Sequence, residues 1–511
     1  MDQANQSAAA RTLRAIGSTW VGVGLIGLIA VYLSLASTVP TALARLLRVE
    51  LVDLDDAVHT ELYRHPLPAA LGALLCANLV VATLVRVPRR LASLGAWCSH
   101  AGVILLAAGS LWYTARGVSG DNLTVRVRGG WSPIRHVYVR RTLAAYVIGP
   151  AASEPVQTPL RHLPPRGEPR ELNVPLGGGG DDVTIRATRY LPTARVVTRW
   201  RDISPNRVPA VQLRVADGED LRTVVLSPSL PRHRQLPGRG YAMIYHAGLD
   251  ARSLAKMIAP ADPNSGPGIR HEVALVVTGK DVAPTLVVIR PDGSRWHAAL
   301  KANEPVDAPL AGRLVRVELL ALFAHAAQVH ELATKIRPSP DDEGELPPAG
   351  PVLRVEVRAG SWGRSTWVPF SAYEHVLPPH LVDLPGNRAV WLSFSRERTP
   401  LPATLTVTRA EYQTYPASRI PKDYRCDVEI AGGGSRRIET LSLNHPVHVG
   451  AFQFSQGSWR PHASNDPRRI YLIAASRPGL PLIWTGCVLI CLGFPIAFYV
   501  KPLILRGRGP S

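Results

Sequence analysis

Histidine is the residue type here with the clearest capacity for chemistry, because a neutral imidazole binds iron and copper well. The chain has 16 histidines, and His100 lies inside a long apolar segment, in the run WCSHAG at 97–102. An ionisable side chain at such a place is costly unless it is neutral, paired or bound to a metal. The position therefore predicts a ligand role for His100. The alternative is a hydrogen bond to a neighbouring helix, or a side chain that reaches the lipid headgroups.

Small residues lie close to His100 in the sequence. Such residues let a second helix, or a flat macrocycle, approach a helix closely. They are Ala101, Gly102, Ala107, Ala108 and Gly109.

Thiols are the second reactive group. Four of the five cysteines lie in apolar segments, and Cys487 and Cys491 are spaced to share one face of a helix. We interpret these four as small packing residues, with thiol–disulfide chemistry at Cys487 and Cys491 as the alternative. Cys426 is the only cysteine in the polar region, so no disulfide framework can hold that region together. The sequence contains no Cys-x-x-Cys-His, so this chain does not itself attach haem covalently.

Four apolar segments predict membrane-spanning helices, because about 20 consecutive apolar residues satisfy their backbone in lipid as a helix. They cover residues 16–38, 67–85, 94–113 and 480–500, with Asn78 and His100 as polar interruptions. Residues 1–115 then form an N-terminal membrane region, and residues 478–511 form a last span with a short tail. A secretory signal is the other interpretation of the first segment, although its length favours a retained anchor.

Basic residues next to the spans predict the orientation, because Lys and Arg beside a helix end resist translocation. Clusters lie at Arg11 and Arg14, at residues 86–90 and at residues 501–508. With four spans, all three clusters fall on one side. We therefore expect a multi-pass membrane protein with both termini cytoplasmic and residues 116–477 extracytoplasmic.

The chain is strongly basic, with 58 Lys and Arg against 39 Asp and Glu, a formal net charge of +19. Such a charge often indicates nucleic acid as a partner, but an extracytoplasmic region does not meet nucleic acid. We expect no nucleic acid partner. Anionic lipid headgroups of the bilayer or an acidic protein partner suit the charge better.

Residues 116–477 alternate apolar and polar residues, as in VTIR at 183–186 and VLRVEV at 352–357. This period of two predicts half-buried strands. A short helix is expected within 314–334, and the proline-rich acidic stretch 338–351 is a candidate boundary between two parts of the domain, or else an exposed loop. The predicted fold is a membrane α-helical bundle of four spans plus a large all-β or β-rich extracytoplasmic domain.

The last part of this domain carries an ordered set of motifs. It begins with Tyr415-Pro416, continues to Tyr424, and then passes a strand and a glycine turn. Two further runs follow before the last apolar segment, LNHPV at 443–447 and GAFQFSQGSW at 450–459. As local structure, these runs indicate two strands with a tight turn, an Asn-x-Pro corner and an aromatic strand.

This set resembles the C-terminal part of the ResB family, also called CcsB, of the System II route of cytochrome c maturation. The family pattern is "YP…P.DY.S.L", then "N.P…G…Q.SW/Y", then a final span. The matching positions here are Tyr424, Asn444, Pro446, Gly450, Gln456 and Trp459. His100 falls where the family has a histidine early in its third span, in a segment like "H.G..L...G". The chain departs from the pattern at Cys426, where Ser is usual, and at Gln453 and Ser455.

The resemblance implies a subunit of a haem exporter and cytochrome c synthase, accessory rather than catalytic in itself. Haem b would bind transiently with His100 as one axial ligand to its iron. A ResC- or CcsA-like haem-handling membrane protein would supply the opposing ligand, since its tryptophan-rich motif is absent from this sequence. The β domain would hold apocytochrome c or orient that partner. The matched motif residues would be structural or docking residues, with His445 and His448 as alternatives for redox chemistry or haem contact.

Two other functions agree with the residues alone. One is a membrane-anchored β scaffold for another complex, without a cofactor. The other is a transmembrane thiol–disulfide carrier that uses Cys487 and Cys491, although thiols at i and i+4 point along parallel directions and do not bridge easily.

Overall fold

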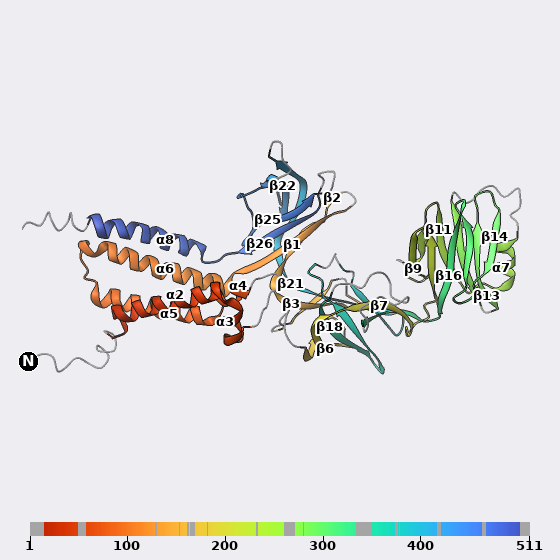
Figure 1. The fold of residues 1–511 in the computed structure, drawn as a ribbon, viewed down its shortest axis with the longest axis horizontal. Coiled ribbons are helices and arrows are strands. Elements are labelled where there is room, and N and C mark those ends of the chain that lie inside the picture. Colours follow the sequence, from red (N-terminus) through yellow and green to blue (C-terminus); the bar gives the residue numbers. More distant parts are fainter. Residues whose placement is uncertain are drawn as a thin grey trace, which may run out of the picture. The chain divides into compact units, whose positions relative to one another are not determined.

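A computed structural model gives the fold of the chain (Figure 1). The structure describes residues 15–49, 58–127, 130–152, 154–160, 163, 169–180, 182–230, 233–259, 271–279, 281–333, 349–373, 377, 379–415, 421–461 and 467–500. The contacts divide the chain into two compact units. The first comprises residues 1–143, 161–167 and 396–511, and the second comprises 144–160 and 168–395.

Four long apolar helices belong to the first unit, and each is long and apolar enough to cross a membrane. They are α2 (Thr19–Thr38), α5 (Pro66–Arg86), α6 (Leu94–Arg116) and α8 (Leu480–Pro495), which continues into a π-helical turn over Ile496–Val500. The four predicted segments are therefore confirmed as apolar helices, with ends that differ by a few residues. The basic residues Arg11 and Arg14 and the tail from 501 lie outside the described residues. Two short helices, α3 (Pro40–Leu47) and α4 (Val58–Tyr63), follow α2.

The long helices contact one another in the order α2, α5, α6, α8 (Figure 1). The contact between α6 and α8 is close because both carry glycine at seven-residue spacing. A β-carbon added at Gly102 would lie 2.6 Å from the carbonyl oxygen of Gly486, and one added at Gly486 would lie 2.5 Å from that of Gly102. The same pattern of backbone meeting backbone pairs Gly109 with Gly479. Only glycine allows two helices to approach this closely.

A curled sheet forms the rest of the first unit, in the strand order β23-β22-β21-β3-β1-β26-β25-β24. The strands are β1 (Val118–Val127), β3 (Ile134–Ile148), β21 (Arg388–Thr414), β22 (Pro421–Gly432), β23 (Ser435–Leu441), β24 (Val447–Val449), β25 (Phe452–Pro461) and β26 (Pro467–Ser476), with β2 (Gly130–Trp131) paired to β1. The two ends of this order approach each other, since Arg437 on β23 donates to the carbonyl oxygen of His448 on β24 (2.8 Å). The curl encloses a core that includes Val428, Phe454 and Leu472.

Strands β3 and β21 continue into the second unit, where β4 (Val156–Leu160) pairs with β3 and β20 (His380–Leu384) pairs with β21. A four-stranded sheet there has the order β19-β18-β6-β5, and a separate pair joins β17 to β7. Their bounds are β5 (Arg170–Leu176), β6 (Val183–Ala194), β7 (Val196–Asp202), β17 (Ala326–Leu332), β18 (Gly350–Ala359) and β19 (Trp362–Pro369).

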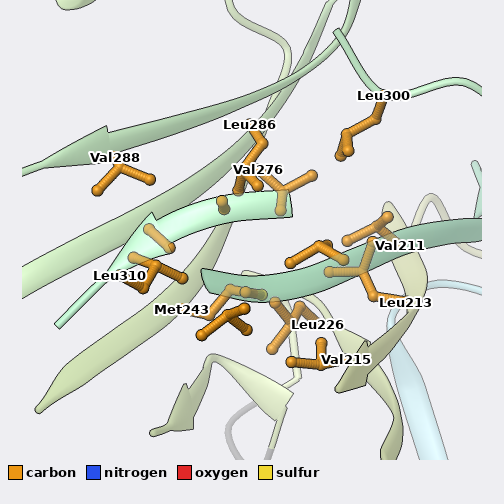
Figure 2. Packing of buried hydrophobic residues seen from close by; sticks show 14 of the residues in the cluster. Val211, Leu213, Val215, Leu226, Met243, Val276, Leu286, Val288, Leu300 and Leu310 are labelled. Atoms are coloured by element: carbon orange, nitrogen blue, oxygen red, sulfur yellow. The ribbon is translucent and has the colours of Figure 1, made fainter. Parts of the chain in front are cut away.

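Two further sheets of the second unit face each other across one apolar core. Their orders are β15-β16-β8-β9 and β10-β11-β12-β13-β14. The strands are β8 (Ala210–Asp217), β9 (Asp220–Leu226), β10 (Gln235–Pro237), β11 (Tyr241–Ala247), β12 (Glu272–Gly279), β13 (Val282–Ile289), β14 (Arg295–Ala299), β15 (Pro305–Leu310) and β16 (Arg313–Phe323), with the helix α7 (Ala251–Ile258) between β11 and β12. Figure 2 shows side chains from both sheets in this core, among them Leu213, Met243 and Leu286, which are fully buried.

The helix expected within 314–334 is wrong, because this stretch forms β16 and β17. Val315, Val317 and Leu319 alternate as buried residues, as a strand requires. A register shift between Leu319 and Ala321 then moves the following apolar residues to the other phase. Because of this bulge, the spacing of the apolar residues in the sequence resembles that of a helix.

The β-rich character of residues 116–477 is confirmed. The candidate boundary 338–351 lies outside the described residues up to 348. The limits between the two units fall at 143/144, 160/161, 167/168 and 395/396.

Candidate functional site

His100 lies six residues after the start of α6, about 9 Å along the helix axis at about 1.5 Å per residue. The preceding helix α5 ends at Arg86, and residues 87–93 connect the two. This short connection makes α5 and α6 antiparallel neighbours. It brings the last turn of α5 to the same level as His100, so that a side chain near the end of α5 can contact the imidazole.

Thr83 of α5 is that neighbour. Its hydroxyl oxygen lies 2.6 Å from Nδ1 of His100. The same hydroxyl donates to the carbonyl oxygen of Leu79 one turn earlier, also at 2.6 Å. Thr83 is buried, whereas the His100 side chain is partly exposed. Among the described residues, none forms a hydrogen bond with the other ring nitrogen of His100, Nε2.

The small residues near His100 lie on two different sides of α6. Gly102 and Gly109 are buried against α8, so these two serve the contact between helices and leave no space for a macrocycle. Ala101 and Ala108 are exposed. His100 and Gly102, two residues apart, project from nearly opposite sides of the helix. The imidazole is therefore directed to α5 and away from the α8 contact.

Asn78, the other polar residue within a predicted span, joins α5 to the start of α2. Its amide nitrogen donates to the carbonyl oxygens of Ile16 and of Ser18, the latter at 3.0 Å. These carbonyls lie just before α2 begins at Thr19. The side chain is buried, and its bonds to backbone indicate a structural role.

The motif that begins at Leu443 forms two tight turns. Ser442 and His445 exchange backbone hydrogen bonds (3.2 and 3.0 Å), and Asn444 between them has a φ of 61°. Asparagine tolerates this left-handed conformation better than most residues, which explains its place here. Pro446 follows the turn and leads into β24. Gly450 makes the next turn with a φ of 59°, and a β-carbon there would lie 2.7 Å from Cγ of Pro402.

Strands β22 and β25, which both carry residues of the motif, contact each other inside the first unit. The thiol of Cys426 on β22 lies 3.7 Å from the side-chain oxygen of Gln456 on β25. Burial raises the pKa of this thiol to about 12, so it is inert. Tyr424 packs at the edge of the same core. Trp459 pairs through its backbone with Ile470, and its side chain lies outside the described part of the structure, as do residues 416–420.

The remaining candidates lie apart from His100. Cys487 and Cys491 are both unbridged on α8, where Cys491 is exposed. His445 and His448 are exposed on the first unit's sheet, at the motif turn and on β24. The structure thus brings Thr83 to His100, and it brings the motif residues of β22 and β25 together.

Sequence reasoning missed a buried ionic network in the first unit. Asp121 on β1 is fully buried and accepts hydrogen bonds from Arg140 (2.8 Å), Arg396 (3.0 Å) and the hydroxyl of Tyr471 (2.6 Å). Burial, together with the bond to Asp121, raises the pKa of Tyr471 to about 12. Arg396 is 275 residues from Asp121 in the sequence, so no local pattern could have indicated the contact. The network ties β1, β3, β21 and β26 together.

A second missed feature is a pair of stacked histidines in the second unit. The rings of His330 on β17 and His380 on β20 have centroids 3.8 Å apart. His330 donates from Nδ1 to the carbonyl oxygen of Trp367 (3.0 Å), and Nε2 of His380 is 2.9 Å from the hydroxyl of Thr366. Burial lowers the pKa of His330 to about 4 and that of His380 well below its usual value. Both rings are therefore neutral at pH 7.

Among the described residues, no group of three or more His, Cys, Asp or Glu side chains is arranged to hold a metal ion. No protein-family model matches the chain, and no curated protein matches it.

Proposed function

We propose that this protein is a haem-handling membrane subunit of the cytochrome c maturation machinery, of the ResB type. One observation carries the proposal: His100 lies in an apolar helix with Nδ1 held by a neighbouring helix and Nε2 without a hydrogen bond from the described residues. The uncommitted Nε2 suits an axial ligand to iron.

Haem b is the cargo in this proposal rather than a resident cofactor. His100 fits one axial position of the haem iron, because its ring is partly exposed. Ala101 and Ala108, which lie near it on α6, are small and exposed. The described residues offer no cluster of ligands around it. A second axial ligand would therefore come from a ResC- or CcsA-like partner in the same membrane. This chain's own part is to hold and orient haem iron, and the covalent attachment takes place elsewhere, which makes the chain an accessory subunit.

The proposed topology is the one that the basic residues predict, with both termini cytoplasmic and the β-rich region outside a bacterial cytoplasmic membrane. Four helices long and apolar enough to span support it. Arg86 is the last residue of the second helix, and Arg89 and Arg90 lie between the second and the third. His100 would then lie nearer the cytoplasmic face, where newly made haem enters. The β-rich region would meet apocytochrome c or the partner's outer loops.

Absorption spectroscopy tests the proposal. The full chain is purified in detergent together with a ResC- or CcsA-type partner, and the Soret band is recorded per mole of complex. We expect the wild type to carry haem and His100→Ala to lose most of the band, while His246→Ala, which alters an exposed histidine on β11, keeps it. An equal Soret band in all three preparations would refute the proposal.

A membrane-anchored β scaffold without haem is the second candidate. The turns at Asn444 and Gly450 favour it, because both residues have backbone reasons to occupy their positions. One result distinguishes the two functions. In a scaffold, His100→Ala changes neither the pigment nor the yield of cytochrome c, whereas in a haem-handling subunit it removes most of the Soret band.

A further inference from the structure

We infer that Thr83 is a positioning residue that selects the tautomer of His100, so that Nδ1 carries the proton and Nε2 carries the free lone pair. The inference concerns two neighbouring helices, α5 and α6, and rests on two hydrogen bonds to one hydroxyl group. The tautomer itself does not depend on haem. Its use for iron binding rests on the proposed function.

The argument is a count of protons. The Thr83 hydroxyl has one proton, and its oxygen lies 2.6 Å from the carbonyl oxygen of Leu79, which can only accept. The hydroxyl proton is therefore directed to Leu79. The second contact, 2.6 Å to Nδ1 of His100, must then be donated by the imidazole to a lone pair of the hydroxyl oxygen. A neutral imidazole has a single proton, so Nε2 is left unprotonated.

The helix keeps this arrangement in place. The bond from a threonine hydroxyl to the carbonyl one turn earlier is common in apolar helices, because it satisfies both groups without water. Thr83 is buried, so no water competes for its proton. The Leu79 carbonyl thus orients the hydroxyl, and the hydroxyl orients the ring. A metal-binding histidine commonly has such a partner on its second nitrogen, which fixes the tautomer and the ring direction.

Three variants test the role of Thr83. Thr83→Val keeps the shape and removes the acceptor, and Thr83→Ser restores it. Thr114→Val is the matched control, since Thr114 makes the same backbone bond on α6, to Ser110 (2.9 Å). The first readout is nitrogen-15 NMR of haem-free protein labelled at histidine, with the His100 signals assigned by their loss in His100→Gln.

The expected result is an Nδ1–H tautomer at His100 in the wild type, in Thr83→Ser and in Thr114→Val, and a mixture of tautomers in Thr83→Val. In the haem-loaded complex, Thr83→Val should weaken haem binding about 10- to 100-fold and Thr83→Ser should recover most of it. An Nε2–H tautomer in the wild type, or no change in Thr83→Val, would overturn the inference. An Nδ1–H tautomer in a wild type that binds no haem would instead refute the proposed function and leave the role of Thr83 intact.

Discussion

At the residue scale, Asp121 is a buried carboxylate that pairs with Arg140 and Arg396 in the first unit. It is fully buried, and Arg396, which is 4% exposed, donates to it. In Asp121→Asn the buried guanidinium group of Arg396 and the partly buried one of Arg140 would lose the Asp121 carboxylate, and breaking a buried pair in this way costs about 3–5 kcal/mol. We expect a matching decrease in the free energy of unfolding of the first unit, measured by denaturation of the purified protein in detergent.

Glu411→Gln is the control for this variant. Glu411 lies on β21 of the same unit and pairs with Arg409, whose side chain is 70% exposed. An exposed pair contributes at most about 1 kcal/mol, so this change should leave the stability nearly unaltered. Equal effects of the two variants would show that the buried network has no special role.

His100 and Thr83 differ in how far the sequence could indicate their roles. An ionisable residue inside an apolar run is visible in the sequence, so His100 was identified from its position alone. Thr83 was not, because a threonine in an apolar segment is common and its contact with His100 depends on the pairing of α5 with α6. The contacts of Asp121 could not be predicted for the same reason, since its partners come from three other strands.

At the scale of elements, the contact between α6 and α8 depends on glycine. In Gly102→Leu the new side chain would meet the backbone of Gly486 and the side chain of Ile490, and the helices would have to separate. Overpacking of this kind costs about 1–3 kcal/mol. We expect a lower melting temperature of the protein in detergent, whereas Gly27→Leu on α2, where an added β-carbon meets nothing within 4 Å, should have little effect. A stable Gly102→Leu protein would contradict the close contact.

The stacked histidines make the second unit sensitive to acid. The pKa of His330 is lowered by burial to about 4, whereas an unfolded histidine has a pKa of about 6.5. The unfolded state therefore binds more protons between these values, and stability present above pH 6.5 is lost as the pH falls toward 4. The pair alone should cost the unit about 3 kcal/mol or more by pH 4.

The surroundings of the pair modify this effect. Arg364 on β19 is a nearby cation that lowers the pKa of both rings. Asp383 on β20 has the opposite sign, because burial raises its pKa and its protonation therefore favours the folded state as the pH falls, which offsets part of the effect. The test is chemical denaturation of the full chain at pH 7, 5.5 and 4. The double variant His330→Gln, His380→Gln should show a flatter pH dependence than the wild type, and His246→Gln should behave as the wild type. A wild type with equal stability at the three pH values would contradict the assignment.

Helices and strands could be predicted from the sequence where one hydrophobic period continued without interruption. The four apolar helices and the alternating strands were evident, because each repeats a single period. The apolar residues of 314–334 resemble a helical pattern because a bulge between Leu319 and Ala321 breaks the period of two within β16. The glycine spacing of α6 and α8 could have indicated their pairing, since Gly95, Gly102 and Gly109 match Gly479, Gly486 and Gly493 at the same interval.

At the scale of the whole molecule, the proposed topology predicts which parts a membrane-impermeant thiol reagent reaches. Single cysteines are introduced into a cysteine-free chain, as Ser435→Cys at the exposed start of β23 and as Ser93→Cys between α5 and α6. In intact cells the first should be labelled, and the second only after permeabilisation. The reverse pattern would place the β-rich region in the cytoplasm and exclude a role in extracytoplasmic haem attachment.

The division of the chain into units could not be predicted locally. Two long strands, β3 and β21, belong to both units, so two of the four limits between the units fall inside strands. Pairing between strands more than 200 residues apart decides this, as between β1 and β26. Composition indicates the class of each region, and long-range pairing sets the arrangement.

Chemical rescue at position 100 tests the haem-ligand account most directly. His100→Gly removes the ligand and leaves space for an added imidazole molecule at the same place. The account predicts that the purified complex of this variant loses its Soret band and regains it, with a low-spin spectrum, when imidazole is added, and that the yield of cytochrome c in cells recovers with it. A variant that keeps the wild-type spectrum without imidazole would contradict the account.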